Sequence, residues 1–159
     1  MKLYHGSNVM IEHVDFSQSH PFKDFGCGFY LTDNLKHARN MATRRMQRAG
    51  GQACVTTFEF DLEAALNDLK VKIFERPCEE WAEFVMLNRN EEIPHPAHDY
   101  DIVIGPIADD SVAISFLLFK DGFITISELI RLLEYRELSI QYFFHNDAAV
   151  SYLKRKMTL

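Results

Sequence analysis

The sequence predicts an α+β fold, and two observations carry this prediction. Strand-like patterns lie near both ends of the chain, whereas helical patterns cluster between them. The chain is also rich in aromatic residues, with 13 Phe and 6 Tyr, which favours a sheet with an aromatic core or cleft. A doubly wound dinucleotide-binding fold is excluded, because Gly26-Cys27-Gly28 precedes a strand and not a helix.

Length and composition predict one domain that spans residues 1–159. The chain is long enough for a real core, and its 47% hydrophobic and 25% charged content is ordinary for a globular protein. The formal net charge of −6 argues against non-specific nucleic-acid binding, although a local basic patch can still attract phosphate. The sequence shows no internal repeat.

The cysteines and the apolar runs predict a cytoplasmic protein with no membrane segment. Cys27, Cys54 and Cys78 are odd in number and show no C-x-x-C spacing, which argues against disulfides and structural zinc. His95 and His98 flank a proline and have no third or fourth partner, so we expect no metal there. The N-terminus lacks the apolar core of a signal peptide, and the longest apolar run, 112–119, is too short to cross a bilayer.

The N-terminal half is predicted to contain three strands around one long helix. Gly6-Ser7-Asn8 reads as a turn that ends the first strand. Oxygens of Thr32-Asp33-Asn34 can cap the helix, and Gly50-Gly51 ends it. Side chains alternate in character after these glycines, which indicates a strand. The expected elements are strands over 2–5, 29–32 and 53–60 and a helix over 35–48.

The C-terminal half is predicted to contain most of the helices. Pro77 stands where a helix can begin, Asp109-Asp110-Ser111 offers capping oxygens for the next, and Thr125 or Ser127 caps the third. Asp147 is the expected cap of the last helix. The expected elements are a turn or helix over 61–68, strands over 69–74, 100–104 and 138–144, and helices over 78–89, 112–119, 128–135 and 148–156.

Two short motifs near the N-terminus resemble a known superfamily. Tyr4-His5-Gly6-Ser7, followed by Phe25-Gly26-Cys27-Gly28-Phe29-Tyr30, resembles the ADP-ribosyltransferases of the diphtheria-toxin and poly(ADP-ribose) polymerase branch. Gln141-Tyr142-Phe143-Phe144-His145 is similar to the last catalytic strand of that branch. The whole chain, including 81–85 and 100–106, resembles a small bacterial group in the same clan, known as domain of unknown function 3990.

This resemblance implies a fold and a reaction. The fold is a split β-sandwich of the ADP-ribosyltransferase type, with helices packed around an NAD cleft. The reaction cleaves the bond between nicotinamide and ribose through a transition state that resembles an oxocarbenium ion. NAD is then the ADP-ribose donor, and no metal is needed. We expect the first two strands to lie side by side and a third, at Ile140-Gln141-Tyr142, to complete the site.

The resemblance also assigns roles to individual residues. His5, Tyr30 and Gln141 are the expected catalytic residues. His5 binds a ribose hydroxyl, Gly6 binds the carboxamide of nicotinamide through its backbone, and Ser7 adds a hydroxyl near a ribose. Tyr30 or Phe29 covers the nicotinamide ring. The full set expected to bind NAD is His5, Gly6, Ser7, Gly28, Phe29 and Tyr30.

Two positions depart from the pattern of the superfamily. Gln141 stands where the polymerases and toxins usually carry a catalytic glutamate, and an amide keeps the hydrogen bond but loses the charge. Chain elongation is therefore not expected, and we predict transfer of single ADP-ribose units or a weak activity. Met41 stands where the polymerases carry a stacking tyrosine, so aromatic stacking is lost there.

Three functional hypotheses follow. The first is a mono-ADP-ribosyltransferase that modifies a protein or nucleic-acid acceptor. Such an enzyme would suit the toxin of a toxin–antitoxin pair, with an antitoxin protein as its partner. The second is a weak or inactive module that binds NAD or ADP-ribose, and the third is an interaction domain. The predicted helix over 35–48 carries five basic residues: Lys36, Arg39, Arg44, Arg45 and Arg48. They form either a solvated face or a landing site for phosphate, which belongs to the NAD pyrophosphate or to a phosphate-bearing acceptor.

Overall fold

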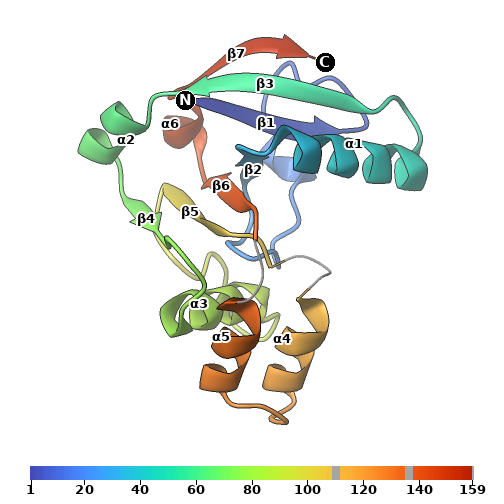
Figure 1. Cartoon of the computed structure of the whole chain (residues 1–159). Helices are drawn as coiled ribbons and strands as arrows, with labels where there is room; N and C mark the ends of the chain where they lie inside the picture. Colours follow the sequence, from blue (N-terminus) through green and yellow to red (C-terminus); the bar gives the residue numbers. More distant parts are fainter. Residues whose placement is uncertain (109–111, 135–137, 159) are drawn as a thin grey trace.

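A computed structural model of the chain describes residues 1–108, 112–134 and 138–158. It is an α+β structure in which one seven-stranded sheet carries helices on its flanks (Figure 1). The strands are β1 (Lys2–Ser7), β2 (Phe29–Thr32), β3 (Cys54–Phe60), β4 (Val71–Ile73), β5 (Ile102–Pro106), β6 (Ile140–Phe144) and β7 (Leu153–Thr158). The helices are α1 (Leu35–Ala49), α2 (Leu62–Asp68), α3 (Glu79–Arg89), α4 (Ala113–Lys120), α5 (Ile126–Glu134) and α6 (Asp147–Val150), and Phe16–Gln18 forms a 3₁₀ turn.

The strand order brings the N-terminal and C-terminal parts of the chain together in the middle of the sheet. The order is β4-β5-β6-β2-β1-β3-β7, and every neighbouring pair is antiparallel except β4 and β5. Between β1 and β2 the register is a single pair, Tyr4 opposite Thr32. The sheet therefore has two well-paired halves, with β1, β3 and β7 across the top of Figure 1 and β4, β5 and β6 below.

Each face of β6 contributes to a different core. Phe143 packs with Phe25, Trp81 and the helices α3 to α5, which lie together below the sheet in Figure 1. Phe144 packs on the opposite face with Phe58 and Phe60. This alternation follows from the period of two in a strand, because successive side chains point to opposite faces. Gln141 consequently lies on the same face as Phe143, near the N-terminal end of β6.

Helix α1 packs directly on the other half of the sheet. Its buried residues Ala38 and Ala42 contact Val55 of β3. Asn34 caps the helix, since its side chain accepts a hydrogen bond from the His37 N–H, and Gly50 follows its last residue with a φ of 74°. The predicted helix over 35–48 and its capping signals are thus confirmed.

Two element predictions were wrong. The expected turn at Gly6-Ser7 is strand, because β1 continues to Ser7 and pairs with Val55 and Cys54 of β3. The last helix, expected over 148–156, is only α6 followed by β7. Strand β7 pairs with the outer edge of β3, and this backbone pairing outweighs the favourable helix propensity of Leu, Lys, Arg and Met in the segment.

The caps differ from the prediction in detail. Asn146, and not Asp147, caps α6 by accepting a hydrogen bond from the Ala149 N–H. At the start of α5, Thr125 and Glu128 form reciprocal hydrogen bonds, so Thr125 is the cap of the two residues considered. The expected cap at 109–111 and the expected helix end at 135 lie outside the described residues. In the part of the chain that the structure describes, we found no helix both long and apolar enough to cross a bilayer.

Candidate functional site

Three neighbouring strands bring the expected catalytic residues to one cleft. His5 comes from β1, Tyr30 from β2 and Gln141 from β6, and these strands are adjacent in the order β6-β2-β1. All three side chains line a cleft of about 720 Å³, a size typical of small-molecule sites. Its other walls are α1, the loop that precedes β2 and the C-terminal end of α3. Gly6 and Met41 also line it.

His5 is a neutral hydrogen-bonding group in this cleft. It is buried, and burial together with the positive charges of Arg45 and Lys23 lowers its pKa to about 4. Its Nδ1 lies 2.7 Å from the carbonyl oxygen of Tyr30, which can only accept. Nδ1 therefore carries the proton and donates a hydrogen bond to this oxygen. The remaining nitrogen, Nε2, then has a free lone pair for a hydroxyl donor. The ring packs on Phe29, with 4.5 Å between the ring centroids.

Gly6 is required by the packing of α1. A Cβ atom on this residue would lie 2.0 Å from the carbonyl oxygen of Ala38 and 2.9 Å from the backbone nitrogen of Ala42. The glycine therefore lets the helix approach β1 closely. This packing role was not expected, since the resemblance implied only that the backbone of Gly6 binds the carboxamide of nicotinamide. The residue still lines the cleft, so the two roles are compatible.

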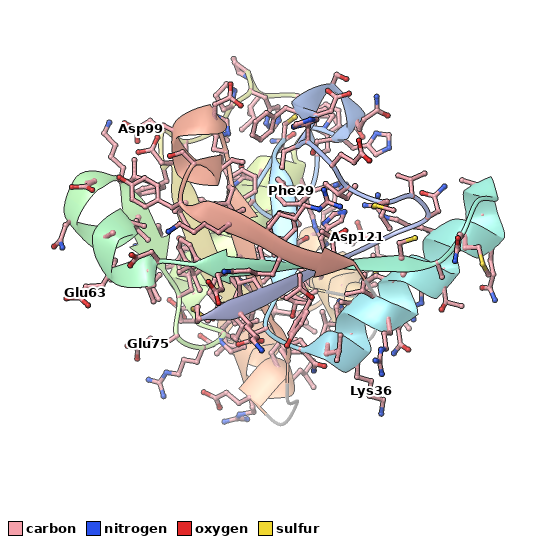
Figure 2. All side chains as sticks on the ribbon, turned by 90° about the horizontal axis from the view of Figure 1, so that it is seen from above. Phe29, Lys36, Glu63, Glu75, Asp99 and Asp121 are labelled. Carbon is pink, nitrogen blue, oxygen red and sulfur yellow. The ribbon has the colours of Figure 1, made fainter. Side chains whose placement is uncertain are left out.

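Ser7, Gly28 and Phe29 were expected to bind NAD but do not line the cleft. Ser7 is buried at the end of β1. A Cβ atom on Gly28 would lie 2.2 Å from the ring of Phe143, so this glycine makes room for a core side chain. Phe29 belongs to the core beneath β1 and β2, and Figure 2 shows its label near the middle of the molecule. Alternation along β2 explains this, because Tyr30 faces the cleft and Phe29 the opposite side.

Tyr30 uses its hydroxyl to hold the loop before β2. The hydroxyl donates to the carbonyl of Gly26 at 2.6 Å and accepts from the N–H of Phe25 at 3.1 Å. Burial raises the pKa of this phenol well above its usual value. The Lys23 ammonium lies 4.9 Å from the centre of the ring, and Phe143 packs against the ring as well. The hydroxyl of Tyr30 is therefore occupied by the loop, and its ring is the part that faces the cleft.

Gln141 is held by a buried polar network. Its Nε2 donates to Oδ2 of Asp24 at 2.9 Å and to the carbonyl of Pro106 at 3.2 Å. Asp24 also accepts from Nε and Nη2 of Arg89, at 3.0 and 2.5 Å, and from the N–H of Ala108 at 3.0 Å. Both Gln141 and Asp24 are buried. A carboxylate thus lies directly beside the amide of Gln141.

The rest of the cleft is strongly basic. Lys23 is partly buried. Burial lowers the pKa of its ammonium group, and repulsion from Arg45 lowers this pKa further. Arg89 is paired with Asp24. A cleft with this excess of positive charge favours an anionic ligand, although the whole chain carries a net charge of −6. The basic residues that line it are Lys23, Arg44, Arg45, Arg48 and Arg89.

The basic residues of α1 lie on two different surfaces. Arg44, Arg45 and Arg48 line the cleft, whereas Lys36 and Arg39 do not. Lys36 lies on the outer side of α1 in Figure 2 and is exposed, as Arg39 is. The solvated face therefore describes Lys36 and Arg39, and the landing site for phosphate stays a prediction for the three arginines.

A comparison with protein-family models identifies the family. The model described as a protein of unknown function (DUF3990) matches residues 1–155. The chain belongs to the DUF3990 family. A search of curated proteins and a search of solved structures found no match.

Sequence reasoning missed part of the site of this DUF3990 member. Asp24, Lys23 and Arg89 line the cleft but were not among the expected site residues. Asp24 and Gln141 are 117 positions apart, so no local pattern predicts their contact. The available signal is an acidic residue directly before Phe25-Gly26, where the loop turns back toward β2.

The histidines considered for metal binding are used in other contacts. Nε2 of His95 lies 2.8 Å from the carbonyl of Asn90, and Nε2 of His98 lies 2.9 Å from the carbonyl of Phe25. Within the described ranges, no three His, Cys, Asp or Glu residues are grouped to hold a metal ion. Cys27, Cys54 and Cys78 are free thiols.

Proposed function

We propose that this protein is an NAD-dependent mono-ADP-ribosyltransferase. The observation that carries the proposal is the cleft itself, because it joins His5, Tyr30 and Gln141 with a basic wall. NAD has an anionic pyrophosphate, two ribose rings rich in hydroxyls and an aromatic leaving group. Each of these parts has a chemical counterpart among the residues of the cleft.

Arginine and lysine side chains bind the pyrophosphate, since Arg pairs with phosphate oxygens through two parallel hydrogen bonds. Nε2 of neutral His5 accepts a hydrogen bond from a ribose hydroxyl. The carbonyl oxygen of Gln141 accepts another, because both hydrogens of its amide point to Asp24 and Pro106. The ring of Tyr30 forms a wall for nicotinamide.

The reaction breaks the bond between the nicotinamide nitrogen and C1 of the ribose. Nicotinamide leaves with the electron pair, and the ribose develops positive charge. A nucleophile of the acceptor then bonds to C1 and loses its proton. Because Gln141 carries no formal charge, we expect slow transfer of single units and no chain elongation. We propose that the acceptor is a protein or a nucleic acid, that the protein acts in the cytoplasm, and that an antitoxin protein controls it.

The decisive experiment measures release of nicotinamide from NAD and transfer of labelled ADP-ribose to components of a cell lysate. We expect both activities in the native protein and a loss of about 100-fold in His5→Ala. His13→Ala is the matched control, because His13 is exposed and does not line the cleft. Equal activity in the two variants, or no turnover of NAD by the native protein, would refute the proposal.

A second candidate function is a module that binds NAD or ADP-ribose without turnover. Two observations favour it: the amide at position 141, and the Lys23 ammonium that lies over the ring of Tyr30. Titration calorimetry with NAD, ADP-ribose and nicotinamide separates the candidates. Binding of the first two ligands with no release of nicotinamide would identify the module.

A further inference from the structure

Asp24 and Gln141 form an acid–amide pair that the superfamily resemblance does not explain. We propose that Asp24 is a positioning residue that acts through Gln141, fixing its carbonyl oxygen toward the ribose and strengthening that oxygen as an acceptor. This inference rests on the proposed function and adds to it how a neutral amide serves where related enzymes use a carboxylate.

The orientation of the amide follows from its partners. The two acceptors of Nε2 are a carboxylate oxygen of Asp24 and the carbonyl oxygen of Pro106, and neither can donate a hydrogen bond. A flipped amide would place its oxygen against both of them. The NH₂ group is therefore fixed in the wall of the cleft, and Oε1 is the group that Gln141 offers to a ligand.

The carboxylate of Asp24 is held in place by its donors. Oδ1 accepts from two nitrogens of Arg89, and Oδ2 accepts from Gln141 and from the backbone of Ala108. Arg89 is itself fixed, because its Nη2 also donates to the carbonyl of Ala108 at 2.8 Å. A carboxylate with four donors does not need to move when a ligand binds.

The charge of Asp24 is transmitted through the amide. Donation from Nε2 to a carboxylate polarises the amide and increases the negative partial charge on its oxygen, as in other chains of hydrogen bonds at low dielectric. Oε1 then accepts a hydrogen bond from a ribose hydroxyl more strongly as positive charge develops on the ring. Gln141 takes up no proton, and the electron pair of the broken bond leaves with nicotinamide.

The same geometry explains why position 141 is not a glutamate here. A carboxylate oxygen in place of Nε2 would lie near 2.9 Å from Oδ2 of Asp24 and 3.2 Å from the Pro106 oxygen. Like charges this close cannot both remain ionised in a buried site. The amide is thus the group that fits beside Asp24.

The first test is a double-mutant cycle in kcat for nicotinamide release. Asp24→Asn and Gln141→Met are each expected to lower kcat about tenfold or more, with a smaller change in KM for NAD. If Asp24 acts through Gln141, the double variant loses no more than Gln141→Met alone. Effects that multiply in the double variant would overturn the proposal.

Thermal stability is the control for simple loss of the ion pair. Asp24→Asn and Arg89→Met each break the contact between Asp24 and Arg89, so we expect similar falls in Tm. Because Arg89 lines the cleft, Arg89→Met is expected to raise KM for NAD, whereas Asp24→Asn is expected to act mainly on kcat. The same changes of kcat and KM in the two variants would show that the ion pair only supports the site as a whole, and would also overturn the proposal.

The second test is the pH profile of Gln141→Glu, which does not require Asp24→Asn to fold. In this variant the new carboxyl group, when protonated, can donate to Asp24 as the amide does, whereas its ionised form cannot. Relative to the native protein, activity is expected to rise as pH falls from 8 to 6. His5 stays neutral in this range, and the other titratable groups that line the cleft, among them Lys23, Arg89, His20 and His37, are common to both proteins.

The outcomes separate this inference from the proposed function. If Gln141→Glu exceeds the native protein at pH 8, the carboxylate works best at position 141 and the acid–amide pair is refuted. If the native protein turns over NAD but Asp24→Asn keeps its kcat, only this inference fails. If the native protein does not turn over NAD, the proposed function fails and this inference fails with it.

Discussion

At the scale of single residues, Gly6 is fixed by one close neighbour. A methyl group there would lie 2.0 Å from a backbone oxygen of α1, which cannot move without moving the helix. We expect Gly6→Ala to lower the free energy of unfolding by about 3 kcal/mol, at the upper end of the usual cost of overpacking. Urea unfolding followed by circular dichroism measures this loss.

Gly50→Ala provides the contrast at this scale. Nothing lies within 4 Å of the position that its Cβ would occupy, but its φ of 74° disfavours alanine. We expect a cost of about 1 kcal/mol from the backbone alone. If both substitutions have the same small effect, the close packing of α1 on β1 does not limit stability.

At the scale of elements, α1 has basic residues on two differently placed surfaces. Arg45 and Arg48 line the cleft, and Lys36 and Arg39 are exposed away from it. Charge reversal at Arg45 and Arg48 to Glu is expected to raise KM for NAD at least tenfold, because the pyrophosphate loses its counter-charges. The matched double reversal of Lys36 and Arg39 keeps the change in net charge equal and is expected to alter KM less than threefold. Steady-state kinetics at constant ionic strength distinguish this local effect from a general electrostatic one.

Strand β7 protects the edge of β3, which the sequence pattern did not predict. Removal of residues 153–159 is expected to expose the backbone of β3 and to cause concentration-dependent association. Size-exclusion chromatography at several protein concentrations measures the effect. The control is Lys154→Ala with Lys156→Ala, which keeps the strand and is expected to elute like the native protein. An unchanged elution profile for the truncated chain would show that β7 is not needed as a cover.

At the scale of the whole molecule, His5 links stability to pH. Its pKa is about 4 in the folded protein and near 6.5 when unfolded, so the unfolded state binds the proton first as pH falls. The stabilisation is complete above pH 6.5 and is lost between pH 6.5 and 4, to a total of about 3 kcal/mol.

His5→Asn tests this dependence, because its amide can still donate to the carbonyl of Tyr30. Unfolding free energies at pH 7.5, 6, 5 and 4 are expected to fall less steeply in the variant than in the native protein. Burial also lowers the pKa of His98, but that contribution is shared by both proteins. Parallel curves for the two proteins would contradict the assignment of the pH dependence to His5.

Local signals in the sequence were enough to predict the α+β class and the main helices. These signals are alternation in strands, oxygens that cap helices and glycines that end them. The sequence also named His5, Tyr30 and Gln141, which do share one cleft. Their role with NAD remains a prediction until turnover is measured.

The neighbours of these residues, in contrast, follow only from the tertiary structure. Whether 153–158 forms helix or strand depends on the open edge of β3, and the partner of Gln141 lies 117 positions away. The reason is physical: strand pairing and buried charge pairs are non-local, so their energies depend on which segments the fold places together. For the same reason, the carboxylate of Asp24 beside Gln141 was found only in the tertiary structure.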